Sequence, residues 1–201
     1  MDAPRWLTPG EQRTWRALVW SSQVLQESLD RQLQREAGMP HAYYTILVRM
    51  SELPGRRCTM TELAQMTQFS ASRLSHAMTR LEKRDWITRA KDRRDPRTTI
   101  ATLTDTGFET LRVAAPSHVE HVRSIIFDRF DDEEQKQLRT LCEKLLDTFA
   151  DLEDRRWPFP EQEDLGGGAD DVLGGDGRAL SGLPLAEPFF GVTEAPVTGD
   201  R

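Results

Sequence analysis

Residues 83–104, KRDWITRAKDRRDPRTTIATLT, combine strand-forming residues with a dense cluster of arginines. Strand-forming residues lie on both sides of a polar tip, which is the pattern of a two-stranded β-hairpin. The predicted tip contains Arg93, Arg94 and Arg97. A hairpin with this much positive charge at its turn is suited to contact a polyanion.

The charge of the chain is distributed unevenly. The net charge is −6, yet residues 56–97 contain eleven Lys and Arg against five Asp and Glu. Binding to a phosphate backbone depends more on the local distribution of charge than on the net charge of the whole chain. A basic middle segment between acidic flanking segments is therefore compatible with nucleic-acid binding.

No apolar run is long enough to span a bilayer, and the first residues lack the layout of a signal peptide. We therefore expect a cytoplasmic protein with no membrane partner. Cys58 and Cys142 lie far apart and belong to no CxxC motif, so neither a disulfide framework nor a zinc cluster is expected.

Long helices are predicted at both ends of the folded region. Apolar side chains recur at the spacing of one helical face in residues 8–37, and a shorter helix is expected at 41–53. Residues 104–153 predict two more helices, the first kinked or interrupted at Pro116 and the second capped by Asp131. These terminal helices are apolar enough to bury a surface against a second copy of the chain.

The central stretch TMTELAQMTQFSASRLSHAMTRLEKR predicts two helices joined by a short turn. Thr59 and Glu62 have the spacing of a capping box at the start of the first helix, and Ser70 can cap the second. Leu74 and Leu81 mark the inward stripe of the second helix, whose other face is polar and basic. Two such helices followed by a hairpin describe a winged helix-turn-helix. The predicted fold is mainly α with a small β-wing.

These motifs together resemble the MarR family of winged-helix transcriptional regulators. The resemblance covers roughly residues 14–152 and is carried by MTELAQMTQFSASRLSHAMTRLEKRDWI, by DPR at 95–97 and by LTDTG at 103–107. The chain has Asp85 where the family usually has a glycine that closes the recognition helix. Aspartate tolerates the left-handed conformation, so the turn is expected to be kept.

The resemblance implies a MarR-type domain over residues 1–153. Within it, residues 8–37 and 104–153 would be dimerisation helices and residues 41–103 the DNA-binding lobe. The implied function is that of a homodimeric transcriptional regulator, a repressor, that binds a pseudo-palindromic operator in double-stranded DNA. A small-molecule effector would bind near the hinge between dimer and DNA lobes and release the repressor.

Polar and basic side chains of the predicted recognition helix are the candidate DNA contacts. Arg73, His76 and Arg80 recur at helical spacing and can reach base edges and phosphates in the major groove. Ser70 and Ser72, near the helix start, can donate to phosphates, although Ser70 can also act only as a cap. The alternative is a solvated basic face without a ligand.

In the wing, the resemblance places Arg97 in the minor groove and assigns Asp95 to hold that arginine. Arg94, with its neighbours Arg93 and Lys91, adds charge that can lie near phosphates. The alternative for Asp95 and Arg97 is an ordinary salt bridge within the hairpin.

Cys58 follows two arginines and precedes a helix N-terminus, surroundings that lower a thiol pKa and favour oxidation. A redox-sensor role is therefore one hypothesis for Cys58. Against it, the peroxide-sensing branch of the resembling family has its reactive cysteine in the first helix, where this chain has none. Cys142 lies on an apolar stripe and is predicted to be a core residue.

Aromatic residues suggest a site for the effector. A pocket lined by Trp15, Trp20, Tyr43 or Tyr44 would stack an aromatic ligand. The alternative is that these side chains belong to the core.

His118 and His121 lie one turn apart and suit two metal ligands, but two histidines do not complete a site. A metal-dependent hydrolase using this pair is the alternative function of another class. The chain has no HExxH, no GxSxG and no glycine-rich phosphate loop, so we expect no enzyme, metal or other cofactor. A sequence-neutral architectural DNA-binding protein is a further alternative. The serine and arginine positions of the recognition helix favour sequence reading.

Residues 154–201 are rich in glycine and acidic residues, with scattered prolines and no periodicity. Such a composition cannot bury a core, so a largely disordered tail is predicted.

Overall fold

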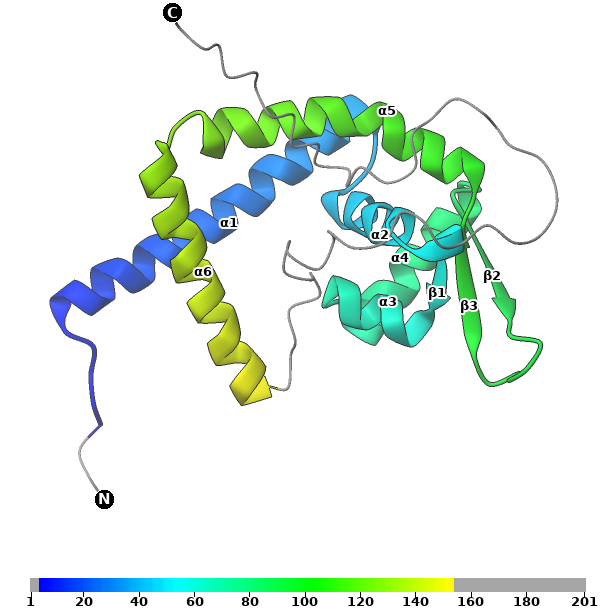
Figure 1. The fold of residues 1–201 in the computed structure, drawn as a ribbon, viewed down its shortest axis with the longest axis horizontal. Coiled ribbons are helices and arrows are strands. Elements are labelled where there is room, and N and C mark those ends of the chain that lie inside the picture. Colours follow the sequence, from blue (N-terminus) through cyan, green and yellow to red (C-terminus); the bar gives the residue numbers. More distant parts are fainter. Residues whose placement is uncertain (1–3, 154–201) are drawn as a thin grey trace, which may run out of the picture. The chain divides into compact units, whose positions relative to one another are not determined.

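A computed structural model describes residues 4–153 of the chain (Figure 1). The elements follow the order α1 (Pro9–Ala37), α2 (His41–Ser51), η1 (Pro54–Arg56), β1 (Arg57–Thr59), α3 (Met60–Thr67), α4 (Ala71–Lys83), β2 (Ile87–Lys91), β3 (Thr99–Leu103), α5 (Asp105–Val122), η2 (Arg123–Phe127) and α6 (Asp132–Glu153). The strands form an antiparallel sheet in the order β1-β3-β2. The predicted fold, mainly α with a small β-wing, is confirmed. The tail predicted at 154–201 lies outside the described residues.

The predicted helix starts are reproduced by side-chain caps. At α3, Thr59 Oγ1 accepts the N–H of Glu62 at 3.1 Å, while the Glu62 carboxylate accepts the N–H of Thr59 at 2.7 Å. Ser70 accepts the N–H of Arg73 at the start of α4, and Asp131 accepts that of Glu134 before α6. These bonds satisfy backbone donors that have no partner within the helix.

Two helix ends depend on the left-handed backbone conformation. Gly38 ends α1 with φ 61°, and Asp85 follows α4 with φ 58°. The expectation that aspartate would keep the turn after α4 is confirmed. Because the chain reverses there, β2 returns along α4 and the hairpin starts directly beside it.

The core of the central lobe is formed by α2, α3, α4 and the inner face of the sheet. Its fully buried apolar side chains are Ile46, Leu47, Met50, Leu63, Leu74, Met78, Leu81 and Ile87. Helix α2 lies in the middle and contacts α3, α4 and β3. The lobe therefore has a core of its own.

The LTDTG motif attaches α5 to the start of the hairpin. The hydroxyl of Thr104 donates to the carbonyl of Asp85 at 2.6 Å and also accepts the N–H of Gly107, which caps α5. A Cβ at Gly107 would collide with the backbone carbonyl of Trp86. Glycine at this position allows α5 to approach the hairpin closely.

A kink or an interruption was expected at Pro116, and the interruption is wrong. Helix α5 runs through Pro116 to Val122, and a π-helical turn follows it at Arg123–Phe127. A proline inside a helix removes one backbone hydrogen bond. Here α5 lies along α1 and buries Leu111, Ala114 and Ala115, so packing outweighs that loss.

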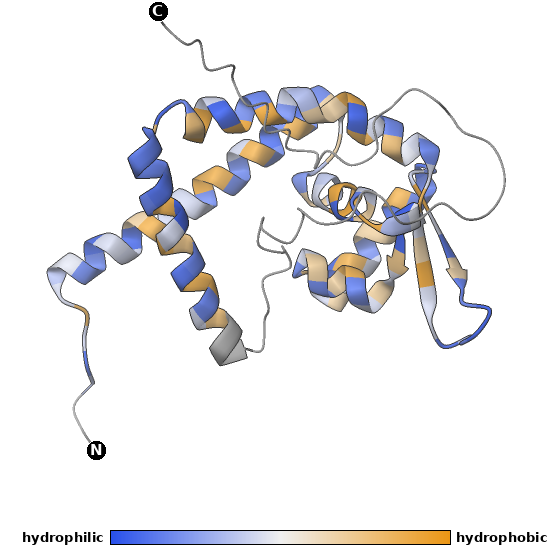
Figure 2. Ribbon diagram, in the orientation of Figure 1, coloured by the Kyte–Doolittle hydropathy of each residue, from blue (hydrophilic) through white to orange (hydrophobic). Residues whose placement is uncertain are grey.

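The first half of α1 and the whole of α6 lack a comparable core. Apolar side chains on both helices are exposed: Trp15, Leu18, Trp20 and Val24 on α1, and Leu138, Leu141, Leu145 and Phe149 on α6. Hydrophobic and hydrophilic residues alternate along both ribbons (Figure 2). Cys142 is exposed too, so its prediction as a core residue is wrong for the single chain. The physical reason is that α6 makes no extensive contact with another described element. None of the described helices combines the length and the apolar content needed to cross a membrane.

Candidate nucleic-acid interface

Helix α4 has two chemically distinct faces. Leu74, Ala77, Met78 and Leu81 are buried in the lobe. Ser72, Arg73, His76 and Arg80 are exposed, as the helical spacing predicts. No ion pair among the described residues involves Arg73 or Arg80. These two charges are available to an external anion.

The N-terminal end of α4 is ordered by its preceding turn. The hydroxyl of Ser70 accepts the N–H of Arg73 at 3.3 Å, and its oxygen lies 3.3 Å from Ser72 Oγ. The guanidinium carbon of Arg73 lies 4.2 Å from the centre of the Phe69 ring. Ser70 thus caps α4.

The tip of the hairpin is held together by two aspartates. Asp92 accepts the N–H of Arg94, and Asp95 accepts both the N–H of Arg97 and the hydroxyl of Thr98. The hydrogen bond from Thr98, followed by that from Arg97, lowers the pKa of Asp95. Asp95 therefore contacts Arg97 through its backbone, and the described ion pairs include none between their side chains.

This turn leaves its basic side chains at the surface. Arg93, Arg94 and Arg97 are all exposed. The Asp95 carboxylate accepts hydrogen bonds from backbone and hydroxyl groups within the turn. The exposed guanidinium of Arg97 is therefore available to bind an external anion.

Arg89 connects the wing to the recognition helix, a contact that the sequence reasoning missed. Its guanidinium donates to the Glu82 carboxylate at 2.6 Å and to the Thr79 hydroxyl at 3.4 Å. The hydrogen bond from Arg89 lowers the pKa of Glu82. Residue spacing predicts contacts within one helix or one hairpin. It does not predict a contact between a helix residue and a strand residue on the two sides of a turn, so this contact could not be inferred from the sequence.

Arg84, the residue that follows α4, connects the same end of this helix to α1. Its guanidinium donates to the carbonyl of Gly38 at 3.0 Å and lies 4.8 Å from the ring centre of Trp86. A cation at the C-terminal carbonyls of a helix is favoured by the helix dipole. The recognition helix is thus held against both the wing and the end of α1.

A family model of MarR proteins matches residues 37–98, the region from the end of α1 through the wing. Sco3205, a MarR family transcriptional regulator from Streptomyces coelicolor with a crystal structure in complex with DNA, is 49% identical to this chain, with a TM-score of 0.69. The match covers 72% of this chain and 91% of Sco3205. The chain belongs to the MarR family of transcriptional regulators.

Two further relatives are also transcriptional regulators. AbsC, a MarR family transcriptional regulator from Streptomyces coelicolor, is 36% identical with a TM-score of 0.68, covering 73% of this chain and 98% of AbsC. YpoP from Bacillus subtilis, an uncharacterized HTH-type transcriptional regulator, is 29% identical over 132 residues, which are 66% of this chain and 82% of YpoP.

Cys58 of this MarR-family chain lies in β1 and is buried. Burial, with a smaller effect of the Glu62 charge, raises the pKa of the thiol to about 11. The expected lowering of this pKa by Arg56, Arg57 and the helix N-terminus is therefore wrong. The side chains of a strand alternate between faces, and Cys58 points into the lobe.

The two histidines considered as metal ligands instead bind helix α1. His118 Nδ1 lies 2.9 Å from Gln32 Oε1, and His121 Nε2 lies 3.0 Å from Ser28 Oγ. The Gln32 amide nitrogen donates to Glu36, so its oxygen is the acceptor and neutral His118 carries a proton on Nδ1. Burial is the largest cause that lowers the pKa of His118 to about 4. No group of three or more potential metal ligands occurs among residues 4–153.

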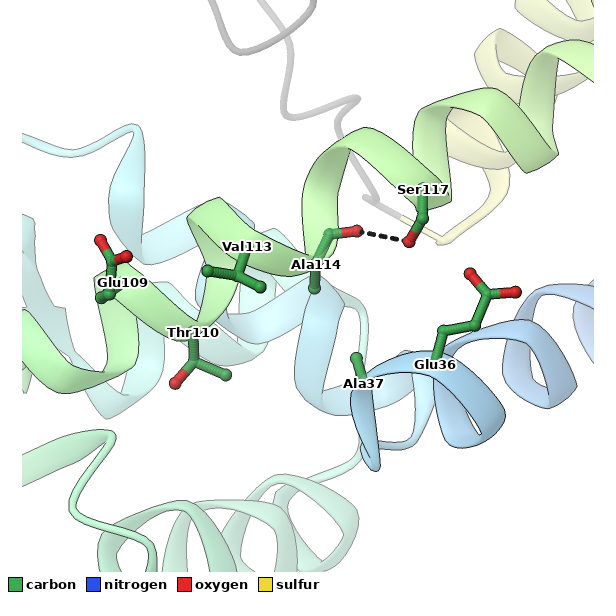
Figure 3. A pocket seen from close by; sticks show the side chains of 7 residues that line it. All are labelled: Glu36, Ala37, Glu109, Thr110, Val113, Ala114 and Ser117. Atoms are coloured by element: carbon green, nitrogen blue, oxygen red, sulfur yellow. Dashed lines mark hydrogen bonds between the residues drawn. The ribbon is translucent and has the colours of Figure 1, made fainter.

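The four aromatic residues predicted for the effector pocket are not brought together. Trp15 and Trp20 are exposed on α1, while Tyr44 is buried with its ring centre 4.3 Å from that of His118. Tyr43 is half-buried near Arg84. A pocket of about 400 Å³ lies between the end of α1 and α5 (Figure 3). Its lining residues are Glu36, Ala37, Glu109, Thr110, Val113, Ala114 and Ser117.

Proposed function

We propose that this chain is a homodimeric, sequence-specific DNA-binding regulator that acts as a repressor. The observation that carries the proposal is the exposed face of α4, on which Arg73 and Arg80 have no ion-pair partner among the described residues. Burial of the opposite stripe fixes this face outward, since a rotation of α4 would expose Leu74 and Leu81.

In the proposed complex, α4 enters the major groove. Arg73, in its first turn, would read a base edge, while Ser72, His76 and Arg80 would contact phosphates or neighbouring bases. The wing would follow the backbone, with Arg97 in the minor groove and Arg94 near phosphates. Sco3205, which is 49% identical, was crystallised in complex with DNA, and this supports the assignment.

The dimer is proposed from the exposed apolar faces of α1 and α6. Leu141 is 66% exposed and Trp20 is 70% exposed, although neither side chain gains from contact with water. A second copy of the chain would cover both faces. Two symmetric recognition helices would then require half-sites about one helical turn, roughly 10 base pairs, apart.

Release by a small-molecule effector is supported by the position of the pocket between α1 and α5. Glu36 and Ala37 line it, and the next residue, Gly38, accepts the hydrogen bond from Arg84 after α4. A ligand that shifts the end of α1 would therefore also shift the recognition helix. Such a regulator would work in the cytoplasm.

Genomic footprinting followed by titration of the recovered duplexes tests the proposal. We expect the purified protein to be a dimer at micromolar concentration and to prefer a pseudo-palindromic site over a scrambled duplex of equal length. The variant R73A/R80A should lose this preference. R112A, which removes an exposed arginine of α5 that is paired with Glu109, serves as the matched control. A monomer, or equal affinity for site and scrambled duplex, would contradict the proposal.

A further inference from the structure

The aromatic ring of Phe69 is held at the entrance of the recognition helix by the turn on either side. Gln68 has a left-handed backbone with φ 55°, and its side-chain amide donates to the carbonyl of Gln65 at 2.7 Å. Ser70 is fixed on the other side because it caps α4. Phe69 itself is half-buried, so one part of its ring packs on the lobe and another part is accessible.

The accessible part of the ring carries the Arg73 side chain. The guanidinium carbon lies 4.2 Å from the ring centre, within the range of a cation–π contact. A guanidinium stacks on an aromatic ring with its flat face, while its N–H groups point outward in its plane. The N–H groups of the Arg73 guanidinium can therefore still bind an acceptor pair while the ring holds its face.

This geometry matters for base reading because arginine recognises guanine with two parallel N–H donors. A long, flexible side chain loses conformational freedom when it makes such a contact. Arg80, on the same exposed face, has no aromatic or acidic partner among the described side chains. The side chain of Arg73 is therefore more ordered than that of Arg80 in the absence of DNA.

We propose that Phe69 is a positioning residue that holds Arg73 ready for a bidentate contact with guanine and so sets the sequence preference at one base pair of each half-site. This inference rests on the proposed DNA-binding function. It assigns the discrimination of that base pair to Phe69 and Arg73 acting together, and it leaves Arg80 to supply contacts that depend less on sequence.

The test starts with selection of binding sites from a library of random DNA duplexes by the wild-type protein. The base pair read by Arg73 is the one at which R73A loses its preference. Affinities are then measured on the selected duplex and on a duplex in which this pair is exchanged, for the wild type, F69L, F69Y, R73A and F69L/R73A. We expect F69L to reduce the discrimination between the two duplexes by roughly three- to thirtyfold. F69Y, which keeps an aromatic face, should retain it.

The double variant separates positioning from a structural role. If Phe69 acts through Arg73, F69L leaves the affinity for the selected duplex unchanged once Arg73 is absent. F108L is the matched control, because the Phe108 ring carries Arg56 at 3.6 Å in the same type of pair outside α4. F108L should leave base preference intact, and thermal melting of each variant confirms that it folds.

Two results would overturn the inference. One is that F69L weakens binding to both duplexes equally. The other is that F69L lowers the affinity for the selected duplex as much in the R73A background as in the wild type. Failure of the wild-type protein to select any duplex would instead overturn the proposed function itself, and the inference with it.

Discussion

The central lobe and the terminal helices use the same apolar residue types with opposite results. In the lobe, Leu63 and Leu81 are completely buried, whereas Leu141 of α6 is 66% exposed. Both sets recur at helical spacing, so periodicity alone does not separate them. The difference lies in what each stripe faces: the lobe stripe meets α2 and the sheet, and the α6 stripe meets no described element extensively. A single chain therefore completes the core of the lobe and leaves the apolar stripe of α6 exposed.

The largest effect is expected where a charge enters the exposed stripe of α6. In L141D the proposed dimer would bury an unpaired carboxylate in each copy, which costs several kcal/mol. We expect the dissociation constant of the dimer to rise by at least about a hundredfold. Analytical ultracentrifugation over a concentration series measures it, and DNA affinity should fall in parallel.

The matched control is T140D, which places the same charge on the opposite side of α6, where Thr140 bonds only the carbonyl of Lys136. It should leave the dimer intact. Dimers of L141D as tight as the wild type would show that α6 does not form the interface.

The converse experiment alters the DNA-binding surface of the lobe and leaves the proposed dimer interface unchanged. R97A removes one charge of the wing tip, and we expect affinity for operator DNA to fall roughly tenfold per protomer at about 0.1 M salt. The slope of log affinity against log salt should decrease by about 1 per protomer. Fluorescence anisotropy at several salt concentrations measures both, and ultracentrifugation should show an unchanged dimer. An unchanged salt slope would mean that Arg97 stays in solvent.

The junction between the two regions should respond to pH. His118 is 5% exposed, and its pKa is lowered to about 4 by burial, then by the nearby His41 and His121. In the unfolded chain the proton is taken up near pH 6.5, about the ordinary histidine value. Unfolding therefore takes up a proton between these values, and stability is lost as the pH falls through that window.

We expect about 2 kcal/mol of this loss between pH 7.5 and pH 5 to come from His118. Urea unfolding at several pH values measures it. H118Q should flatten the curve in this window, while H76Q, which changes an exposed histidine of α4, should not. Parallel curves for the wild type and H118Q would show that His118 is not buried in solution.

Features set by neighbouring residues were predictable from the sequence. Thr59, Ser70 and Asp131 cap helices because their side chains reach backbone donors three residues ahead, and the structure shows those bonds. The hairpin and the left-handed turn at Asp85 follow from equally local preferences. The exposed face of α4 follows from its period, so the candidate contacts Arg73, His76 and Arg80 were placed correctly on the surface.

Features that depend on distant packing were not predictable. Cys58 is buried because β1 pairs with β3, and this pairing reverses the expected direction of its pKa shift. Pro116 does not interrupt α5 because α1 supports that helix along its length. Arg89 meets Glu82 only after the chain has turned at Asp85. Each of these depends on contacts between elements, for which sequence spacing gives no rule.

The smallest expected effect compares the same local motif in the two regions. Thr59 with Glu62 and Asp131 with Glu134 are reciprocal caps, with the first starting α3 in the lobe and the second starting α6. Loss of such a cap costs about 1 kcal/mol of helix stability.

In the monomeric L141D background, T59A should lower the free energy of unfolding by this amount, because α3 belongs to the core. D131A should leave it nearly unchanged, since a helix without tertiary packing adds little to cooperative unfolding. In the dimeric wild type, D131A should cost about as much as T59A, because α6 is then packed. Urea unfolding of the four variants gives these values. Equal losses in the monomeric background would mean that α6 is part of the core of a single chain, and the contrast between the two regions would fail.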